Sequence, residues 1–451
     1  MTGLKQNKRL VVLGSGESGV GAAVLGKIKD YDVFVSDFGT IAPKYKDVLL
    51  KENILFEETK HTKEQILNAD VVVKSPGIAD SSSLVVELNE KGITVISEIE
   101  FASWFTKAKL IGITGSNGKT TTASLLYHIL KNAGLNVGIG GNIGDSFALQ
   151  VAKCDYDYYV LELSSFQLDG IESLKLDVSI LLNITPDHLD RYEYSLDKYI
   201  NSKFQIIKNI DENTVFIYSN DDENIVNKLP SVTLPGTSYP FSINELGSEF
   251  ARLKDSDIII DINNPLRISV DSTSLKGKHN SYNIMASVTA ASALGIQESQ
   301  ILAAVETFQP IEHRMERVVV LNDVEYINDS KATNVDSTFY ALDSIEDNVI
   351  WIAGGVDKGN DYSQLIPLVN SKVHGMICLG KDNQKLHTTF GGFVKRIENA
   401  KNADEAVKKA SAMAGKGFTV LLSPACASFD LFKNYEDRGL KFKQAITKLI
   451  K

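Results

Sequence analysis

The segment ITGSNGKTT, residues 113–121, constrains the fold of this chain more than any other stretch. It follows a short apolar run, Leu110–Ile113, and leads into SLLYHILKNAG, which is typical of a helix that ends at Gly134. A strand, a glycine turn and a helix in this order can bind phosphate, because backbone N–H groups of the turn and of the helix start point at phosphate oxygens. We therefore predict a nucleotide-binding α/β domain around this segment.

The spacing of this loop differs from the standard G-x-x-x-x-G-K-[ST] pattern, which would place a glycine where the chain has Ile113. Lys119 is expected to reach the β- and γ-phosphates, and the Thr120 hydroxyl is expected to ligate Mg²⁺. A glycine turn that merely ends a strand is the simpler alternative, but it leaves Gly-Lys-Thr-Thr at a helix start unexplained. The glycines within the segment are Gly115 and Gly118, and Gly112 directly precedes it.

Length and composition set the class of protein. A chain of 451 residues is too long for one ordinary core, and about three domains are expected. The net charge of −10 argues against a nucleic-acid or anionic-membrane surface, and no run of 18 apolar residues could span a membrane. The cysteines are scattered and the N-terminal residues lack a signal-peptide core, so we expect a cytoplasmic protein.

The first part of the chain resembles a dinucleotide-binding unit. KRLVVLGSG, residues 8–16, predicts a strand and a glycine turn, and Asp37 ends a second strand about twenty positions later. SPGI at 75–78 adds another tight turn at a strand end. The glycine turn alone also fits a nicotinamide-dependent oxidoreductase, which would leave the GKTT loop without a role. An α/β layer that binds no nucleotide is a further alternative.

Metal-binding side chains follow the phosphate loop at two strand ends. In YYVLELSSFQL, Glu162 alternates with Leu161 and Leu163 and so faces away from them. A buried carboxylate is costly without a partner, and a metal ion is the natural one. The next apolar strand gives way to NITPDH, which ends in His188. We expect these side chains at the edge of the sheet where Thr120 lies.

The last part of the chain predicts a second parallel α/β sheet. RVVVLNDVEYINDS is typical of a hairpin around Asn322–Asp323, and NVIWIAGG, GMICLG and FTVLLSP are short apolar strands separated by helical spans. The predicted fold is therefore α/β with three domains: a Rossmann-like domain at 1–97, a central P-loop ATPase domain with a mostly parallel sheet at 98–310, and a Rossmann-like domain at 311–451.

Together these motifs resemble the Mur ligases, the ATP-dependent amide-forming enzymes of peptidoglycan synthesis. The TGSNGKTT loop has that family's spacing. HRME at 313–316, INDSKATN at 327–334 and SPACASFDLFKNYEDRG at 423–439 resemble the branch that adds D-glutamate. The resemblance covers essentially the whole chain. It implies ATP, two Mg²⁺ sites, and the substrates UDP-N-acetylmuramoyl-L-alanine and D-glutamate. We expect a monomer with no nucleic-acid or membrane partner.

The resemblance implies a reaction through an acyl phosphate and a tetrahedral intermediate, with ADP and phosphate released. The third domain would have to close on the second when ATP binds. Thr120 and Glu162 would hold one Mg²⁺, and His188 and Lys203 the second. An ammonium cannot ligate a metal, so Lys203 would be carbamylated. The catalytic residues implied are Lys119, His188, Lys203 and Arg314.

The remaining positions that match the family fall into three groups. The ATP group is Gly115, Ser116, Asn117, Gly118, Lys119, Thr120, Thr121, Asn280, Asn283, Arg314 and Asp329. The group for the UDP-muramoyl substrate is Ser15, Glu17, Ser18, Asp37, Ser75, Pro76, Gly77, Asn142 and Ser164. The D-glutamate group is Lys331, Thr333, Lys358, Ser428 and Tyr435.

The chain departs from the family in two places. Phe38 and Gly39 stand where a familiar relative has a hydroxyl and an arginine, and Tyr435 stands where some relatives have phenylalanine. Two alternatives remain beside the D-glutamate branch. A sister ligase would add another amino acid, and a P-loop nucleotide switch would hydrolyse ATP with no response to any amino acid.

Overall fold

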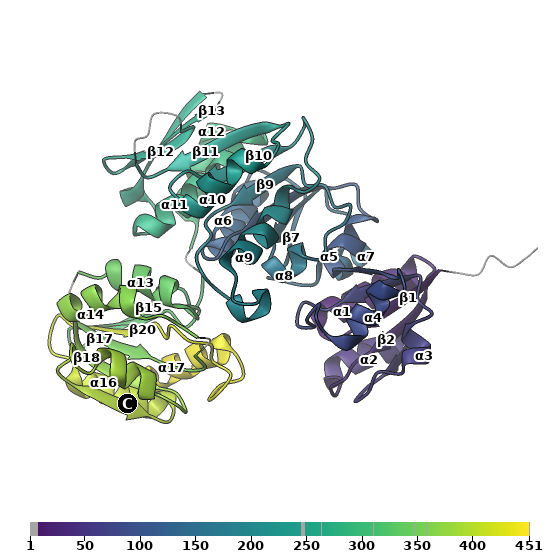
Figure 1. Ribbon diagram of the computed structural model, residues 1–451. Helices are drawn as coiled ribbons and strands as arrows, with labels where there is room; N and C mark the ends of the chain where they lie inside the picture. Colours follow the sequence, from purple (N-terminus) through teal and green to yellow (C-terminus); the bar gives the residue numbers. More distant parts are fainter. Residues whose placement is uncertain are drawn as a thin grey trace, which may run out of the picture. The chain divides into compact units, whose positions relative to one another are not determined.

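The computed structural model describes residues 8–244, 249–262, 264–309, 311–346, 348–357 and 359–450. It divides into two compact units, one of residues 1–272 with 281–307 and one of residues 273–280 with 308–451. Three β-sheets organise these units, two in the first and one in the second (Figure 1). This division does not decide the domain boundaries at 97/98 and 310/311, which stay predictions. None of the described helices is both long and apolar enough to cross a membrane.

The first sheet is parallel, with the strand order β3-β2-β1-β4-β5. Its central strands are continuous apolar runs, because helices cover both faces of a parallel sheet. The predicted strand, glycine turn and helix at residues 8–28 are confirmed. The strands are β1 (Arg9–Leu13), β2 (Asp32–Ser36), β3 (Leu55–Glu57), β4 (Val71–Lys74) and β5 (Thr94–Ile96), and the helices are α1 (Glu17–Ile28), α2 (Pro43–Lys51), α3 (Lys63–Ile66) and α4 (Ser83–Glu90).

The second sheet has the strand order β14-β13-β12-β11-β10-β9-β6-β8-β7. It is parallel from β7 to β12, and an antiparallel extension of β13 and β14 forms one edge. The strands are β6 (Lys109–Thr114), β7 (Val137–Gly141), β8 (Tyr158–Glu162), β9 (Val178–Leu181), β10 (Val215–Ser219), β11 (Thr237–Ser242), β12 (Ala251–Lys254), β13 (Asp257–Ile262) and β14 (Asn264–Ser269).

Helices of the central region pack around this second sheet (Figure 1). They are α5 (Glu98–Ser103), α6 (Lys119–Asn132), α7 (Phe147–Lys153), α8 (Ser165–Leu168), α9 (Leu196–Phe204), α10 (Glu223–Lys228), α11 (Lys278–Ala293) and α12 (Glu298–Thr307). The helix predicted to follow the phosphate loop is α6. It stops two residues before Gly134, whose positive φ of 84° ends the helix at little steric cost.

The third sheet combines a hairpin with parallel strands in the order β15-β16-β20-β17-β18-β19. The predicted turn at Asn322–Asp323 is confirmed, since both residues have positive φ, as a type I′ turn requires. The strands are β15 (Glu316–Leu321), β16 (Val324–Asn328), β17 (Val349–Ala353), β18 (Val373–Leu379), β19 (Ile397–Ala400) and β20 (Thr419–Leu422), and the helices are α13 (Val335–Asp343), α14 (Ile366–Lys372), α15 (Gln384–Phe390), α16 (Ala403–Met413) and α17 (Tyr435–Leu449).

The two sheets of the first unit share a core through α1, α5 and α7. One hydrophobic cluster runs from β1 through these helices to β8. Helix α1 approaches α7 closely at Gly21, which has no side chain. A Cβ at this position would lie only 1.9 Å from Ser146 Oγ. Beside this contact, Glu98 accepts hydrogen bonds from Ser146 Oγ (2.7 Å) and the Ala148 N–H (2.6 Å). Burial raises the pKa of the Glu98 carboxyl to about 7, although both hydrogen bonds oppose this rise.

The buried Glu98 carboxyl makes a prediction about stability and pH. A carboxyl whose pKa rises on folding binds its proton more tightly in the folded state. Its contribution is therefore most favourable below the unfolded pKa near 4.5 and is lost as the pH rises through about 7. The loss should amount to about 3 kcal/mol. We expect Glu98→Gln to remove this decline in urea unfolding measured from pH 5 to pH 8. The same decline in variant and wild type would contradict the assignment.

Candidate active site

The site forms where three parallel strands of the second sheet end. Strand β6 lies between β8 and β9, with Ile113 opposite Glu162 and Thr114 opposite Leu181. The carboxyl ends of the three strands therefore meet at one edge. The glycine loop at 115–118, the Glu162 side chain and the loop after β9 all leave the sheet there. Ligands of open α/β sheets bind at this edge.

The loop after β9 holds the glycine loop in place. The Ser116 N–H donates to Asn183 O (2.9 Å), and the Asn117 N–H donates to Asn183 Oδ1 (2.8 Å). The Ser116 hydroxyl donates to Thr185 O (2.7 Å). Gly118 precedes α6 with a φ of 86°, a conformation that L side chains rarely adopt. These bonds fix a turn whose predicted ligand is a phosphate group.

The first turn of α6 carries the predicted phosphate and metal ligands. The Lys119 ammonium donates to Gly115 O (2.7 Å) and Ser116 O (2.9 Å), so it lies against the loop. Thr120 and Thr121 are buried, and Thr121 Oγ1 has no hydrogen-bond partner among the described residues.

Asn283 of α11 lies beside this turn. Its Oδ1 accepts a hydrogen bond from Thr122 Oγ1 (3.2 Å), and it is the atom that a Cβ at Gly118 would meet at 2.3 Å. The structure thus brings Asn283, of the predicted ATP group, against the glycine loop.

Glu162 is the predicted metal ligand whose geometry is most informative. The side chain is only 2% exposed. Its Oε1 accepts a hydrogen bond from Asn142 Nδ2 (2.8 Å), whereas the buried Oε2 has no partner in the described part of the chain. An unpaired buried carboxylate oxygen is costly. Thr120 and Glu162 therefore fit the oxygen ligands that Mg²⁺ prefers.

His188 lies in the loop after β9 with a left-handed φ of 53°. Its backbone N–H donates to Asp187 Oδ1 (2.9 Å), and its Nε2 lies 3.6 Å from Asp187 Oδ2. The imidazole packs edge-on against Phe166 of α8, with ring centroids 5.2 Å apart. These contacts hold an imidazole and a carboxylate together near the glycine loop.

Lys203 of α9 is 1% exposed, although the sequence around it is that of an ordinary surface helix. Its amine donates to Gly115 O (2.9 Å) and lies 3.5 Å from Thr114 Oγ1. Burial is the main cause that lowers the pKa of this amine well below its usual value, and the Lys119 charge lowers it further. Burial therefore disfavours the charged form of this amine beneath the phosphate loop.

Two residues that the sequence analysis did not single out complete this region. The Tyr199 hydroxyl lies 3.1 Å from Ser116 Oγ, and its ring lies 4.8 Å from Lys203 Nζ. Tyr199 precedes Lys203 by one helical turn, so an i, i+4 pair was the available signal.

Arg191 is the second such residue. Its guanidinium donates to Pro76 O (3.2 Å) and, at 3.4 Å each, to Gly77 O and Ile78 O, and it lies 4.5 Å from the Phe166 ring centroid. It joins the SPGI turn of the first sheet to the ring that packs on His188.

The predicted residues of the first sheet gather at its carboxyl edge. Asp37 Oδ2 accepts hydrogen bonds from both the N–H and the hydroxyl of Ser15, each at 2.6 Å. Ser75 Oγ lies 3.4 Å from Gly14 O, so the two tight turns touch. Glu17 and Ser18 lie in the first turn of α1. Ser164, which is also predicted to contact the UDP-muramoyl substrate, caps α8 and forms hydrogen bonds with Gln167.

The second unit contains the other predicted ATP residues. Asp329 Oδ1 accepts from the Met315 N–H (3.2 Å), and Oδ2 accepts from Ser423 Oγ (2.9 Å). Burial raises the pKa of Asp329 to about 6, although the neighbouring Arg314 charge opposes this rise. Asn280 also belongs to this unit, and its amide donates to Lys276 O (2.8 Å). Arg314 Nε is buried without a hydrogen-bond partner in the described chain.

Four of the five residues predicted for D-glutamate are described, and Lys358 lies outside the described residues. Lys331 Nζ lies 5.2 Å from the Tyr435 ring, and Tyr435 O accepts from Ser330 Oγ (2.8 Å). Buried Arg438 donates to Ser330 and to Cys426 O, which joins the loops that carry Thr333 and Ser428. The structure therefore brings together two loops and the start of α17.

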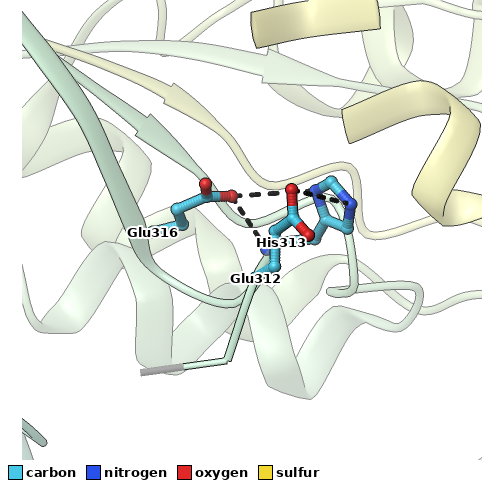
Figure 2. A group of neighbouring side chains, drawn as sticks. All are labelled: Glu312, His313 and Glu316. Carbon is cyan, nitrogen blue, oxygen red and sulfur yellow. Dashed lines mark hydrogen bonds and ion pairs between the residues drawn. The ribbon is translucent and has the colours of Figure 1, made fainter. Parts of the chain in front are cut away.

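Glu312, His313 and Glu316 form a second cluster of metal-ligand types (Figure 2). Lys443 forms ion pairs with both carboxylates, so its ammonium already offsets half of their negative charge. His313 Nδ1 lies 2.9 Å from Asn328 Nδ2, and its backbone N–H donates to Glu316 Oε2 (2.9 Å). These bonds fix the backbone on both sides of Arg314, which favours a supporting role over metal binding.

Comparison with known proteins identifies the family. Three family models match the chain in order: MurD N-terminal domain at residues 9–84, Mur ligase middle domain at 113–291, and Mur ligase, glutamate ligase domain at 313–426. The chain belongs to the Mur ligase family. The matches cover the glycine loop and, in the second unit, the loop that carries Lys331 and Thr333.

Similar proteins include UDP-N-acetylmuramoylalanine--D-glutamate ligases. The one from Christiangramia forsetii is 52% identical, over 98% of this chain and 100% of that protein. The one from Bacteroides fragilis is 50% identical over the same shares. Among solved structures, UDP-N-acetylmuramate-alanine ligase of Thermotoga maritima has a TM-score of 0.63 at 16% identity, covering 98% of this chain and 99% of that one. MurF ligase of Thermotoga maritima in complex with ADP has a TM-score of 0.60 at 17% identity and covers both chains fully. These structures show the Mur ligase fold, with three α/β domains.

The contacts of Arg191 predict a stabilising role. Arg191→Ala removes hydrogen bonds to three carbonyl groups and a cation–π contact, so we expect the free energy of unfolding to fall by about 1–3 kcal/mol. Lys198→Ala, which breaks an exposed ion pair with Glu193 in the same region, is the control and should cost less than about 1 kcal/mol. Urea unfolding of both variants checks this. Equal losses would contradict the role given to Arg191.

Proposed function

We propose that this protein is an ATP-dependent ligase that joins D-glutamate to UDP-N-acetylmuramoyl-L-alanine during peptidoglycan precursor synthesis. The observation that carries the proposal is the meeting of Lys119, Thr120, Glu162 and Lys203 around one glycine loop. The similar proteins also support it, because UDP-N-acetylmuramoylalanine--D-glutamate ligases are identical to this chain at about half of the positions over 98% of its length. A nicotinamide-dependent oxidoreductase would need only the glycine turn of the first sheet and would leave the GKTT loop without a role.

The glycine loop would receive the phosphates of ATP. The N–H groups at the start of α6 and the Lys119 ammonium would face phosphate oxygens and stabilise the charge that develops during transfer. A carboxylate oxygen of the L-alanine residue attacks the γ-phosphorus, and ADP leaves. The amine of D-glutamate then attacks the carbonyl carbon of the acyl phosphate and loses a proton. The tetrahedral intermediate collapses to the amide and expels phosphate.

Thr120 and Glu162 are the residues proposed to hold one Mg²⁺. The unpaired Oε2 of Glu162 supports this assignment. Bound Mg²⁺ would supply positive charge to the phosphate oxygens. Lys119 then needs to neutralise only part of the charge on the transferring group.

Lys203 is proposed to become a carbamate that holds a second Mg²⁺ with His188. The neutral form of the amine, whose share rises as burial lowers the pKa, attacks CO₂, forms a nitrogen–carbon bond and releases a proton, which leaves a carboxylate on the side chain. The chain then has an anion beside Gly115, where an ammonium could not ligate a metal.

The second unit is proposed to bind D-glutamate. Lys331 and Lys358 offer cations for a dicarboxylate, and Thr333 and Ser428 offer hydroxyl donors. Tyr435 would contribute through its backbone at the start of α17. Arg314, Asp329 and Asn280 are proposed to complete the ATP site, with Arg314 facing developing negative charge.

The first sheet is proposed to bind the UDP part, through Ser15, Glu17, Ser18, Asp37 and the turn at 75–77. Asn142 and Ser164 would face the muramoyl part. We also expect the enzyme to act as a monomer in the cytoplasm. Its three cysteines are free, in agreement with a reducing compartment.

The function is tested by mass spectrometry of the nucleotide product. The enzyme is incubated with ATP, Mg²⁺ and UDP-N-acetylmuramoyl-L-alanine, and one amino acid is added at a time. A mass gain of one glutamyl residue with D-glutamate alone supports the proposal. A gain with a different amino acid would assign the chain to a sister ligase. ATP hydrolysis without a ligated nucleotide product would show that the protein is only a P-loop hydrolase.

Variants of Lys203 test the carbamate. Lys203→Ala should lower activity by about a hundredfold or more, because the second metal loses a ligand. Lys203→Glu should retain more activity than Lys203→Ala, because it restores an anion at this place. Steady-state rates with saturating substrates measure both. Activity in Lys203→Ala close to that of the wild type would contradict the carbamate.

A further inference from the structure

Ala425 has a backbone conformation that its side chain disfavours. Its φ is 59°, in the left-handed region that alanine rarely adopts, and the residue is fully buried. It lies in the loop after β20, three positions before Ser428, which is proposed to bind D-glutamate. A strained backbone persists only where surrounding contacts hold it. The contacts around Ala425 therefore bear on the placement of Ser428.

The loop that follows β17 holds the backbone on both sides of Ala425. The Gly354 N–H donates to Pro424 O (2.9 Å), just before the left-handed residue. Just after it, the Val356 N–H donates to Ala427 O (2.8 Å), and the Ala427 N–H donates back to Val356 O (3.2 Å). The two loops are therefore joined by backbone hydrogen bonds along their length.

Two side chains of the same loop hold the middle of the segment. Asn360 Nδ2 donates to Ala425 O (3.0 Å) and to the Tyr362 hydroxyl (3.2 Å). The Tyr362 hydroxyl lies 3.1 Å from Cys426 Sγ, and both of these residues are buried. Asn360 and Tyr362 thus contact the left-handed residue and the one that follows it.

Asp357 fixes these two side chains in turn. Its Oδ2 accepts from the Tyr362 hydroxyl (2.8 Å), and its Oδ1 accepts from the N–H groups of Gly359 (2.7 Å) and Asn360 (3.0 Å). Burial alone would raise the pKa of Asp357, but these hydrogen bonds outweigh it and lower the pKa. Burial raises the pKa of the Cys426 thiol to about 11, so the thiol keeps its proton at neutral pH and can donate it to the phenol oxygen.

We propose that Asn360 and Tyr362 are positioning residues for D-glutamate binding, because they hold Ala425 in its left-handed conformation and so place Ser428. This inference rests on the proposed function. Neither side chain has to touch the amino acid. Without them, the loop would adopt its binding conformation for only part of the time, and the apparent dissociation constant would rise by the reciprocal of that fraction. Saturating D-glutamate would restore the bound state, so the chemical step would keep its rate.

Steady-state kinetics of the full-length enzyme test this role. Asn360→Ala should raise the KM for D-glutamate about tenfold, as expected for a loop that is competent about a tenth of the time. The kcat should stay within about twofold of the wild type, because uniform binding is lost rather than an interaction of the transition state. The KM values for ATP and for UDP-N-acetylmuramoyl-L-alanine should not change. Tyr362→Phe removes only a hydroxyl, so it should fold and show a smaller rise in the same constant.

A second substitution separates positioning from a general loss of stability. Glycine adopts a positive φ without the steric cost of a Cβ, so Ala425→Gly should make the loop less dependent on Asn360. The double variant should therefore have a KM for D-glutamate clearly below that of Asn360→Ala. Asn402→Ala is the matched control, because Asn402 caps α16 by accepting the Glu405 N–H (2.9 Å). It should lower stability but leave this KM unchanged.

The outcomes distinguish the inference from the proposed function. If the wild type ligates D-glutamate, an unchanged KM for D-glutamate in Asn360→Ala would overturn the inference alone. A double variant no better than Asn360→Ala would overturn it too, and so would an equal rise in Asn402→Ala, which would show an effect of stability. Wild-type enzyme that forms no product with D-glutamate would overturn the proposed function, and the inference with it.

Discussion

The parallel pairing of β6 with β8 and β9 is the constraint on which the active site depends. Each strand is a short, mostly apolar run, and polar residues stand at its carboxyl end or just after it. The pairing places Glu162 beside Ile113 and places the loop that ends in His188 beside Thr114. Strand pairing therefore brings together residues that lie far apart in the sequence.

The same edge concentrates polar groups that the folded protein satisfies incompletely. Glu162 Oε2 is buried without a partner among the described residues, and the Lys203 amine is buried against the Gly115 carbonyl and the Thr114 hydroxyl. Unpaired buried polar groups destabilise a fold by about 1–3 kcal/mol each. The bound cations and the carbamylation of Lys203 proposed above would relieve this cost. The free protein is therefore least stable at the edge of the sheet where the proposed ligands would bind and stabilise it.

Much of the fold could be predicted from sequence because it depends on local patterns. The glycine loop, the alternation around Glu162 and the turn at Asn322–Asp323 each have a short-range physical cause. Burial of Lys203 could not be read from its helix, because the groups that cover it come from other segments. Arg191 and Glu98 were missed for the same reason, because their hydrogen-bond partners lie more than 40 residues away in the sequence. The roles of the site residues stay predictions.

Transfer of oxygen from the substrate to phosphate tests the central claim most directly. The L-alanine carboxylate of UDP-N-acetylmuramoyl-L-alanine is labelled with ¹⁸O, and the phosphate released with ATP and D-glutamate is analysed by mass spectrometry. If this edge activates the carboxylate as an acyl phosphate, each phosphate released carries one ¹⁸O atom and the amide product keeps the other. Phosphate that takes its new oxygen from water would show hydrolysis of ATP instead, and would contradict the account.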